Sequence, residues 1–220
     1  MGQGLVIYGA GGFGREVLQI VKDLNRIAPT WDCRGFLVDS GFVAEQRVHG
    51  LPVLGDAEWL RNHVDVQVIV AVGSPAARRR ITRRIAAYGN QFATLIHPRA
   101  WIGDHVEIPA GCVICAGALI TTDIFLGAHT HVNIGSTIGH DAKISDFVTI
   151  SPGCNVSGGV RLEEGVELGS GAVIVPGVSV GAWSVIGANA VVSKDIPRDC
   201  TAVGMPARPI KFRQANWQDA

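Results

Sequence analysis

The most constraining feature of this sequence is an aliphatic residue at every sixth position along its second half. Each sixth residue from 102 to 192 is isoleucine, leucine or valine, and Ile96 extends the series backwards. The residue four places further on is mostly small or valine, as at Cys112, Ala118 and Ala142. A period of six matches neither a helix of 3.6 residues per turn nor a simple alternating strand.

This period predicts a parallel β-helix, in which each hexad supplies one flat face and the turn to the next face. Three hexads close one triangular coil, with the aliphatic side chain inward and the small residue at the corner. Residues 96 to about 197 then form five to six coils without an evident insertion. The pattern alone does not give the hand, and a left-handed coil would break the usual right-handed crossover rule.

A small α/β domain is expected over residues 1–93, ahead of a β-helix domain at 94–220. An apolar strand at 5–8 leads into the glycine-rich segment GAGGFG, residues 9–14, and then into an amphipathic helix. Glycines in this context let a backbone approach a phosphate, and the start of the helix offers free N–H groups to it. The alternative is that the glycines only form a tight turn between strand and helix.

Two further strands, at 35–39 and 66–73, make three β/α units, which is too few for a full dinucleotide domain. We therefore expect a nucleotide diphosphate rather than NAD. Ser74 is expected to cap a helix that carries an arginine-rich segment. Such a segment is more often a solvated helix face, so only Arg78, the arginine nearest the start of the helix, is assigned to a phosphate. The residues expected to contact the substrate here are Gly11, Gly12, Phe13, Asp39, Gly73, Ser74 and Arg78.

The amino-acid composition limits which binding partners and which cellular setting are expected. The 220 residues include 19 basic and 19 acidic side chains, so no net charge favours binding to nucleic acid or to an anionic membrane. Five cysteines, an odd number, suggest a reducing, cytoplasmic setting, and the N-terminus lacks the features of a signal peptide. Residues 168–193 carry no charge over a length that could span a bilayer, but five glycines, a proline and the six-residue period indicate soluble structure.

One hexad carries an adjacent imidazole and carboxylate, His140 and Asp141. His140 lies outside the inward aliphatic column. The equivalent position in other hexads is mostly Ala, Asp, Pro or Gly. An outward histidine fills no core, so this pattern favours a general base over the alternative of a surface or subunit-interface residue. Asp141 would then fix the tautomer of the ring and stabilise the imidazolium.

Other candidates are weaker. Cys112 and Cys115 resemble half of a zinc site, but no second pair follows and both fit the repeat, so we expect no metal. His129 and His131 are candidates for substrate or interface contact, and His97 is expected to be structural.

The repeat and the ending AVGMPARPIK, residues 202–211, resemble the left-handed β-helix of the hexapeptide acyltransferases. With its N-terminal domain, nearly the whole chain is similar to the sialic acid O-acetyltransferase-like family. Its characterised members include bacterial N-acetyltransferases acting on nucleotide-linked 4-amino-4,6-dideoxy sugars. The matching segments are IYGAGGFGRE, GFLVD, IVAVGS, LIHPRA, VNIGSTIGHDAKISDFVTISPG and VGMPAR.

The resemblance implies a homotrimer with acetyl-CoA between neighbouring coils, and a shared site using His140 of one subunit and coil residues such as Gly158 of another. It implies that His140 is the base and Asp141 its orienting acid, that Asn133 meets the amino group of the sugar, and that the Gly158 N–H receives the thioester carbonyl. Lys211 is a candidate for a CoA phosphate. Family members often have His at the position of Phe13, so one polar contact to the sugar nucleotide is missing here.

The expected function is acetyl-CoA-dependent N-acetylation of a nucleotide-linked amino sugar in bacterial surface glycan synthesis. O-acetylation of a hydroxyl, as on sialic acid, uses the same base, and only Asn133 favours an amine. A non-catalytic β-helix scaffold or ligand sensor would not need the His140–Asp141 pair. The sequence leaves open whether the nucleotide is UDP, dTDP or GDP.

Overall fold

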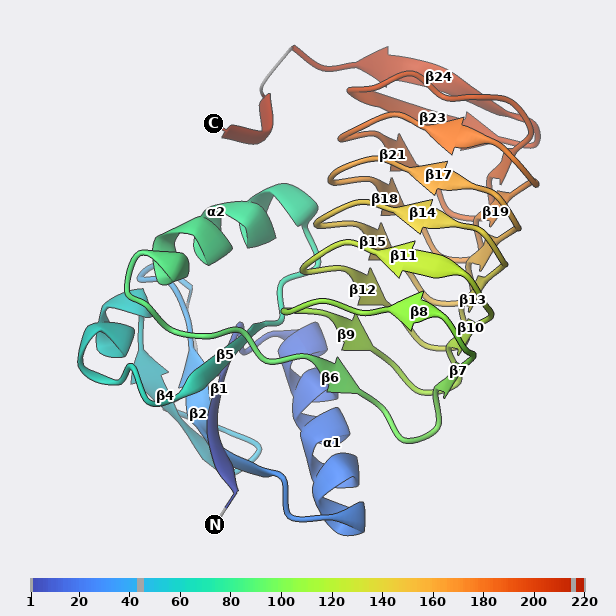
Figure 1. The fold of residues 1–220 in the computed structure, drawn as a ribbon. Helices are drawn as coiled ribbons and strands as arrows, with labels where there is room; N and C mark the ends of the chain where they lie inside the picture. The colour runs from blue at the N-terminus through green and yellow to red at the C-terminus, as the bar shows by residue number, and fades with distance from the viewer. Residues whose placement is uncertain (1, 43–45, 215–216, 220) are drawn as a thin grey trace.

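The computed structural model describes residues 2–42, 46–214 and 217–219 and shows a small α/β domain beside a β-helix (Figure 1). The first domain has a five-stranded sheet in the order β3-β4-β2-β1-β5, parallel except for the β3–β4 hairpin. Its elements are β1 (Gln3–Tyr8), α1 (Gly12–Ile27), β2 (Trp31–Leu37), β3 (Arg47–Val48), β4 (Leu51–Gly55), the 3-10 helix η1 (Ala57–Asn62), β5 (Gln67–Val70) and α2 (Pro75–Ala86).

The sequence-based expectations for this domain are largely confirmed. The three strands and both helices form where predicted, the apolar stripe of α1 is buried, and Ser74 caps α2 by accepting a hydrogen bond from the Ala77 N–H (3.4 Å). The β3–β4 hairpin and η1, which occupy the place of a third long helix, were not predicted. Their strands and turns are short, and short elements give little periodic signal.

A left-handed β-helix follows, and three hexads make each of its coils, as predicted. Leu119 pairs with Thr137, and Thr137 with Asn155, each in parallel register. The strands are β6 (Leu95–Ile96), β7 (Trp101–Ile102), β8 (Val106–Glu107), β9 (Val113–Ile114), β10 (Leu119–Ile120), β11 (Ile124–Leu126), β12 (His131–Val132), β13 (Thr137–Ile138), β14 (Lys143–Ile144), β15 (Thr149–Ile150), β16 (Asn155–Val156), β17 (Arg161–Leu162), β18 (Glu167–Leu168), β19 (Val173–Ile174), β20 (Ser179–Val180), β21 (Val185–Ile186) and β22 (Val191–Val192).

These strands form three faces. One sheet runs β7-β10-β13-β16-β19-β22, a second runs β8-β11-β14-β17-β20, and a third runs β6-β9-β12-β15-β18-β21-β23-β24. We place the domain boundary between Phe92, which still pairs with Val68 of the first domain, and Leu95, which begins the third sheet. The chain ends in the antiparallel hairpin of β23 (Cys200–Gly204) and β24 (Ala207–Phe212) and the short η2 (Trp217–Asp219).

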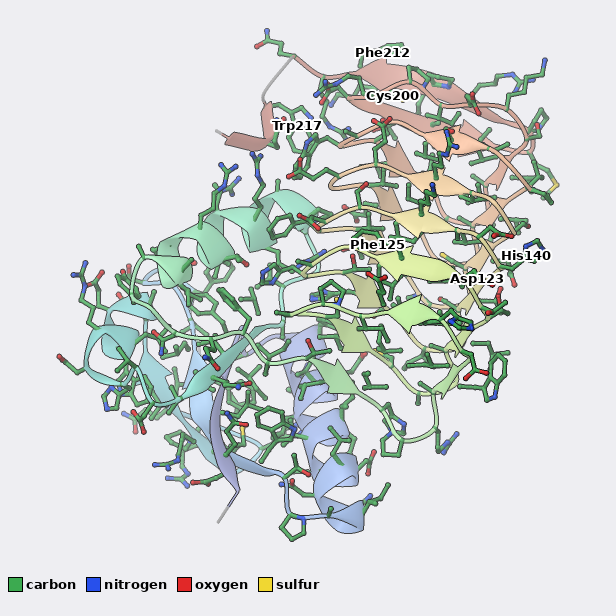
Figure 2. The ribbon with its side chains drawn as sticks, in the orientation of Figure 1. Asp123, Phe125, His140, Cys200, Phe212 and Trp217 are labelled. Carbon is green, nitrogen blue, oxygen red and sulfur yellow. The ribbon has the colours of Figure 1, made fainter. Side chains whose placement is uncertain are left out.

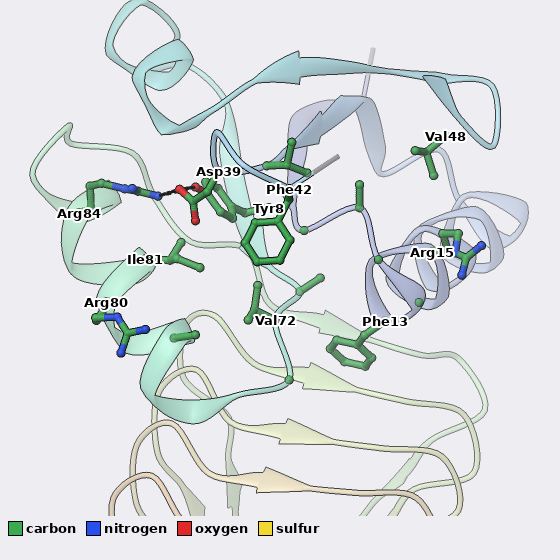
Figure 3. A pocket seen from close by; sticks show the side chains of 18 of the residues that line it. Tyr8, Phe13, Arg15, Asp39, Phe42, Val48, Val72, Arg80, Ile81 and Arg84 are labelled. Carbon is green, nitrogen blue, oxygen red and sulfur yellow. Dashed lines mark hydrogen bonds and ion pairs between the residues drawn. The ribbon is translucent and has the colours of Figure 1, made fainter. Parts of the chain in front are cut away.

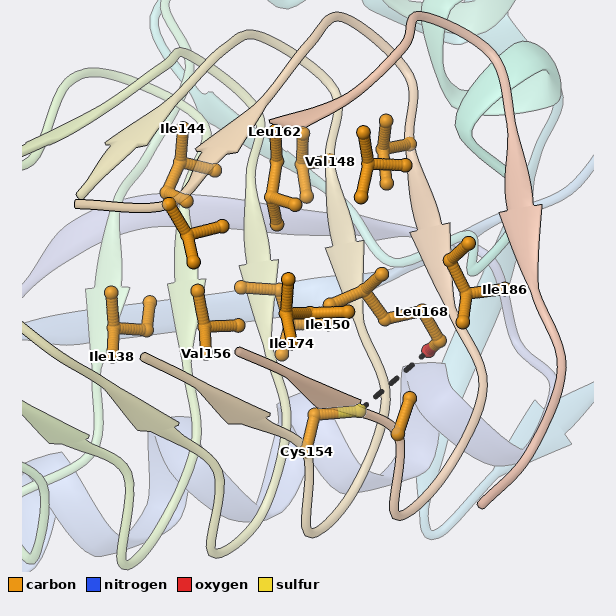
Figure 4. Close-up of a cluster of buried hydrophobic side chains, with 14 of the residues drawn as sticks. Ile138, Ile144, Val148, Ile150, Cys154, Val156, Leu162, Leu168, Ile174 and Ile186 are labelled. Atoms are coloured by element: carbon orange, nitrogen blue, oxygen red, sulfur yellow. Dashed lines mark hydrogen bonds between the residues drawn. The ribbon is translucent and has the colours of Figure 1, made fainter. Parts of the chain in front are cut away.

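The core of the β-helix is the predicted aliphatic column. Ile138, Ile150 and Ile174 are fully buried, and Figure 4 shows such side chains stacked from coil to coil. Cys154 takes a small-residue position and directs its thiol to the Gly169 carbonyl (3.2 Å). The uncharged segment 168–193 forms the last coils, and among the described residues no helix is long and apolar enough to cross a membrane.

A column of aromatic residues at one corner joins the two domains. His129, Phe147 and Trp183 occupy equivalent positions of different coils, and all have left-handed backbone conformations. His129 stacks on Phe147 with ring centroids 5.1 Å apart. A Cβ on Gly165 would lie 2.1 Å from the indole of Trp183, so position 165 requires glycine. The guanidinium of Arg79, on α2, covers the Trp183 ring at 5.0 Å.

Arg78 holds the domains together at the same corner. Its side chain is fully buried. The guanidinium donates five hydrogen bonds to backbone carbonyls, from Nη1 to Val72 (2.8 Å) and Gly73 (3.1 Å), from Nε to His129 (2.9 Å), and from Nη2 to Phe147 (2.7 Å) and Val148 (3.2 Å). Burial lowers the pKa of Arg78 to about 9, so the group stays charged at neutral pH. One cation therefore connects the end of β5 to two successive coils.

The histidines of this junction are neutral. Burial, followed by the nearby charge of Arg78, lowers the pKa of His129 to about 4. The same two causes hold the pKa of His131 well below its ordinary value, since its ring is fully enclosed. Both ring nitrogens of His131 lack a hydrogen-bond partner among the described residues. Protonation of either ring would place a second cation beside Arg78.

We expect Arg78→Met to lower the free energy of unfolding by about 3 kcal/mol, because carbonyls in a dry junction would lose their donor. Chemical denaturation measures the change. The matched control is Arg34→Met, which breaks the exposed ion pair between Arg34 and Asp32 and should cost about 0.5 kcal/mol or less. Similar losses in both variants would contradict the assigned role of Arg78.

Stability should also fall as pH decreases from about 6.5, the pKa of an unfolded histidine, to about 4. In that range the unfolded chain binds more protons than the folded one, so acid favours unfolding. His129 alone would contribute about 3 kcal/mol to this loss. Denaturation curves of His129→Gln, which cannot titrate there, should show a shallower pH dependence than the wild type. Parallel profiles for the two proteins would rule out this contribution.

Candidate active site

The main cavity of the N-terminal domain opens at the carboxyl ends of its parallel strands and has a volume of about 1030 Å³. Figure 3 shows Tyr8, Asp39 and Arg84 together at one end, and Phe13 and Arg15 at the other. The cavity is lined by segments 8–13, 38–39, 48–49 and 71–73, together with Arg15, Phe42, Ala77, Arg80, Ile81 and Arg84. Ligands of open α/β sheets bind at this edge.

The glycines of the first turn have two different roles. A Cβ on Gly9 would lie 2.7 Å from the Ala71 carbonyl oxygen, and one on Gly14 would lie 1.8 Å from the Gly9 oxygen. These two glycines therefore permit the close packing of helix and strand. Gly11 and Gly12 have open space where a Cβ would lie, and they line the cavity. Their bare backbone and the free N–H groups of the first turn of α1 form a cradle suited to an anion.

Of the seven N-terminal residues expected to contact the substrate, five line this cavity and two do not. Gly11, Gly12, Phe13, Asp39 and Gly73 are among the lining residues. Ser74 is exposed and caps α2, as described above. The assignment of Arg78 to a phosphate is wrong, because its guanidinium is fully buried and saturated by carbonyls of the domain junction.

Three other arginines bring positive charge to the cavity instead: Arg15, Arg80 and Arg84. Sequence reasoning missed all three, although a signal was present for Arg80 and Arg84. With Ala77 and Ile81 they occupy positions spaced by three and four, the stripe that one face of a helix presents. Arg78 lies on another face, toward the β-helix.

His140 and Asp141 form a compact pair on the β-helix. They lie in the turn between β13 and β14, and Asp141 adopts a left-handed backbone conformation (φ 60°). His140 Nδ1 lies 2.7 Å from Asp141 Oδ2, and both side chains are about two-thirds exposed. An ionised carboxylate can only accept, so Nδ1 carries the proton and Nε2 of the neutral ring is left unprotonated.

Gly158 lies directly above this ring because it takes the equivalent position in the next coil. A Cβ on Gly158 would be 2.7 Å from both Nε2 and Cε1 of His140, so only glycine leaves room for the imidazole. The contact is within one chain. Successive coils of the same chain bring the two residues together, and a site shared with Gly158 of another subunit stays a prediction.

The cavity and the His140 pair lie on opposite sides of the chain. The N-terminal domain packs against the sheet that contains β9, β12 and β15, where Phe13 contacts His131 at 5.0 Å. His140 occupies the corner between the other two sheets, and Figure 2 shows it at the edge of the β-helix farthest from the N-terminal domain. None of the described residues near His140 lines the cavity.

Asn133 lies on the domain side of the β-helix, one full face away from His140. It follows β12, is buried, and its Nδ2 donates to the Ile150 carbonyl (2.8 Å). Lys211 is exposed on β24. Cys112 and Cys115 are buried, with the Cys112 thiol directed to the Gly127 carbonyl (3.4 Å).

Comparison with known proteins agrees with both halves of the fold. Residues 4–85 match the model of the PglD N-terminal domain, and residues 159–194 match the bacterial transferase hexapeptide repeat. A GDP-perosamine N-acetyltransferase of Escherichia coli O157:H7 is 34% identical over 152 residues, which is 67% of this chain and 66% of that relative.

Two solved structures match over almost the whole chain. The acetyltransferase domain of PglB from Neisseria gonorrhoeae, in complex with acetyl coenzyme A, is 33% identical with a TM-score of 0.86, covering 96% of this chain and 100% of its own. PerB from Caulobacter crescentus, in complex with CoA and GDP-perosamine, is 29% identical with a TM-score of 0.86, covering 94% and 97%.

The Escherichia coli relative is named as a GDP-perosamine N-acetyltransferase and the PglB structure as an acetyltransferase domain, and these matches do not support the sialic acid O-acetyltransferase-like label. The two family models match the two domains in their order along the chain, and the PglB structure matches across both domains. The chain therefore belongs to the family of acetyltransferases that join a PglD-type N-terminal domain to a hexapeptide-repeat β-helix.

Proposed function

We propose that this protein transfers an acetyl group from acetyl-CoA to the amino group of a nucleotide-linked amino sugar in bacterial glycan synthesis. The observation that carries this proposal is the pairing of His140 with Asp141 beneath Gly158, with Nε2 left unprotonated on a side chain that is about two-thirds exposed. The relatives named above are acetyltransferases of this kind, and two have CoA or acetyl-CoA in their structures.

In this proposal His140 Nε2 accepts a proton from the attacking nitrogen as the new C–N bond forms. Asp141 holds the tautomer and stabilises the resulting imidazolium. The proton then passes to the departing CoA sulfur, so the imidazole ends neutral. The Gly158 N–H would receive the oxygen of the thioester carbonyl as negative charge develops on it.

The cavity would hold the nucleotide, with its diphosphate at Gly11 and Gly12 and the arginines nearby. The sugar would then extend past Phe13 toward the β-helix. Because His140 of the same chain lies on the far corner, the amino group must meet His140 of another copy. This separation supports a homotrimer in which acetyl-CoA lies between neighbouring β-helices, with Lys211 available to a CoA phosphate.

Two further features suit this arrangement. Trp101 and Leu119 project from one flat sheet with exposed fractions of 56% and 45%, an apolar surface that a second β-helix would cover. Asn133, on the domain side, would approach the amino group that extends from the cavity of its own chain. All five cysteines are unpaired, which suits the reducing cytoplasm where we place the protein.

The first test measures CoA thiol release from acetyl-CoA with UDP-, dTDP- and GDP-linked 4-amino sugars. We expect turnover with one of them, and a loss of about 10²–10⁴-fold in kcat for His140→Ala, because the general base is removed. The matched control is His105→Ala, which removes another exposed histidine from a β-helix turn and should keep full activity. Activity only with hydroxyl acceptors would indicate O-acetylation. No activity with either amino or hydroxyl acceptors would favour a non-catalytic scaffold.

The assembly is tested separately by the mass of the protein in solution. Light scattering should give three times the chain mass of 23.2 kDa, the mass of the proposed homotrimer. A mass above that of one chain is required because a complete site needs the cavity of one copy and the His140 of another. A monomer with full activity would contradict the shared site, since one chain keeps its two halves apart.

A further inference from the structure

The C-terminal segment returns from the far end of the β-helix to the N-terminal domain. Its described residues are 213–214 and 217–219. After β24 the chain runs back, and η2 packs against α2 (Figure 1). Because α2 also lines the cavity, the last residues of the chain lie against a wall of the candidate substrate site.

Arg213 anchors the start of this segment. Its guanidinium donates from Nη1 to the Cys200 carbonyl (3.2 Å) and from Nη2 to the Thr201 hydroxyl (3.0 Å). The same group covers the ring of Trp217 at 4.6 Å. Gln218, the next residue, is only 5% exposed, so the end of the segment is docked on the protein rather than solvated.

Arg80 connects the docked segment to the cavity, which it lines. Its Nη1 donates to the backbone carbonyl of Gln218 (3.4 Å), and no other residue in the described ranges bonds this guanidinium. A carbonyl leaves the positive charge intact, and the N–H groups on Nε and Nη2 remain available to an anion. Figure 3 shows Arg80 on α2, across the cavity from Arg15 and the start of α1.

We infer that the C-terminal segment positions Arg80 to bind the diphosphate of the nucleotide sugar, with the Gln218 carbonyl as the contact that holds the guanidinium. This inference rests on the proposed function. An exposed arginine without such a contact samples many rotamers, and ordering it on binding lowers the affinity. Gln218 is thus a positioning residue, and it makes nucleotide binding depend on a segment that is anchored at the far end of the same β-helix.

The test measures the affinity of the full-length protein for UDP, dTDP and GDP by calorimetric titration. In Trp217→Ala the ring under Arg213 is lost and the segment should undock, so the best-bound nucleotide should bind about three- to tenfold more weakly, the range expected for ordering one long side chain. A chain that ends at Gln214 should show the same loss. The matched control is Phe212→Ala, which removes an exposed aromatic ring of β24 and should bind as the wild type does.

Arg80→Met separates positioning from general stability. It removes the charge itself and should weaken binding by about tenfold. Adding Trp217→Ala to it should cause no further loss, because the two changes act through one guanidinium. The affinity should also fall less steeply with KCl concentration in Trp217→Ala, as in Arg80→Met, since one cation no longer meets the phosphates.

Full affinity in both Trp217→Ala and the shortened chain would overturn the inference and leave the proposed function standing. A loss in Trp217→Ala that recurs in the Arg80→Met background would also overturn it, because the segment would then act on stability and not through Arg80. Failure of the wild type to bind any of the three nucleotides would overturn the proposed function as well.

Discussion

Closure of each coil after three hexads is the constraint on which the rest of this structure depends. It stacks every side chain on its equivalent in the next coil, so a pattern along the chain becomes a column in space. The aliphatic column gives the core, and dispersion and burial stabilise it without help from long strands. The same register places Gly158 over His140 and Gly165 beneath Trp183, where any other residue would collide with the ring above or below.

The second organising element is the junction between the domains. Arg78 reaches across it with five hydrogen bonds, and the neutral rings of His129 and His131 lie in the same dry layer. This buried cation has no directly paired carboxylate and is held by carbonyl dipoles and the nearby charge of Glu167, so the geometry must be well defined. Because this junction fixes the cavity to one face of the β-helix, it also fixes the direction in which a bound sugar would project.

Much of the candidate site could be predicted because its chemistry is local in sequence. His140 and Asp141 are adjacent, and Gly11 and Gly12 follow a strand directly, so short patterns were enough to find them. The arginines that line the cavity were harder to predict. Arg78 is the arginine closest to the start of α2, yet a helix turns about 100° per residue, and this rotation directs it into the junction while Arg80 and Arg84 face the cavity.

By itself, the sequence determined the order of the two domains, the coil of three hexads and the identity of the histidine–carboxylate pair. These follow from periodicity and from neighbours along the chain, which need no knowledge of long-range contacts. Only the tertiary structure decided that Asp39 meets Tyr8 and Arg84, that Gly158 touches His140 within one chain, and that the cavity and His140 face away from each other. Those relations depend on how the α/β domain packs against one of three equivalent-looking faces, and the hexad pattern is the same for all three.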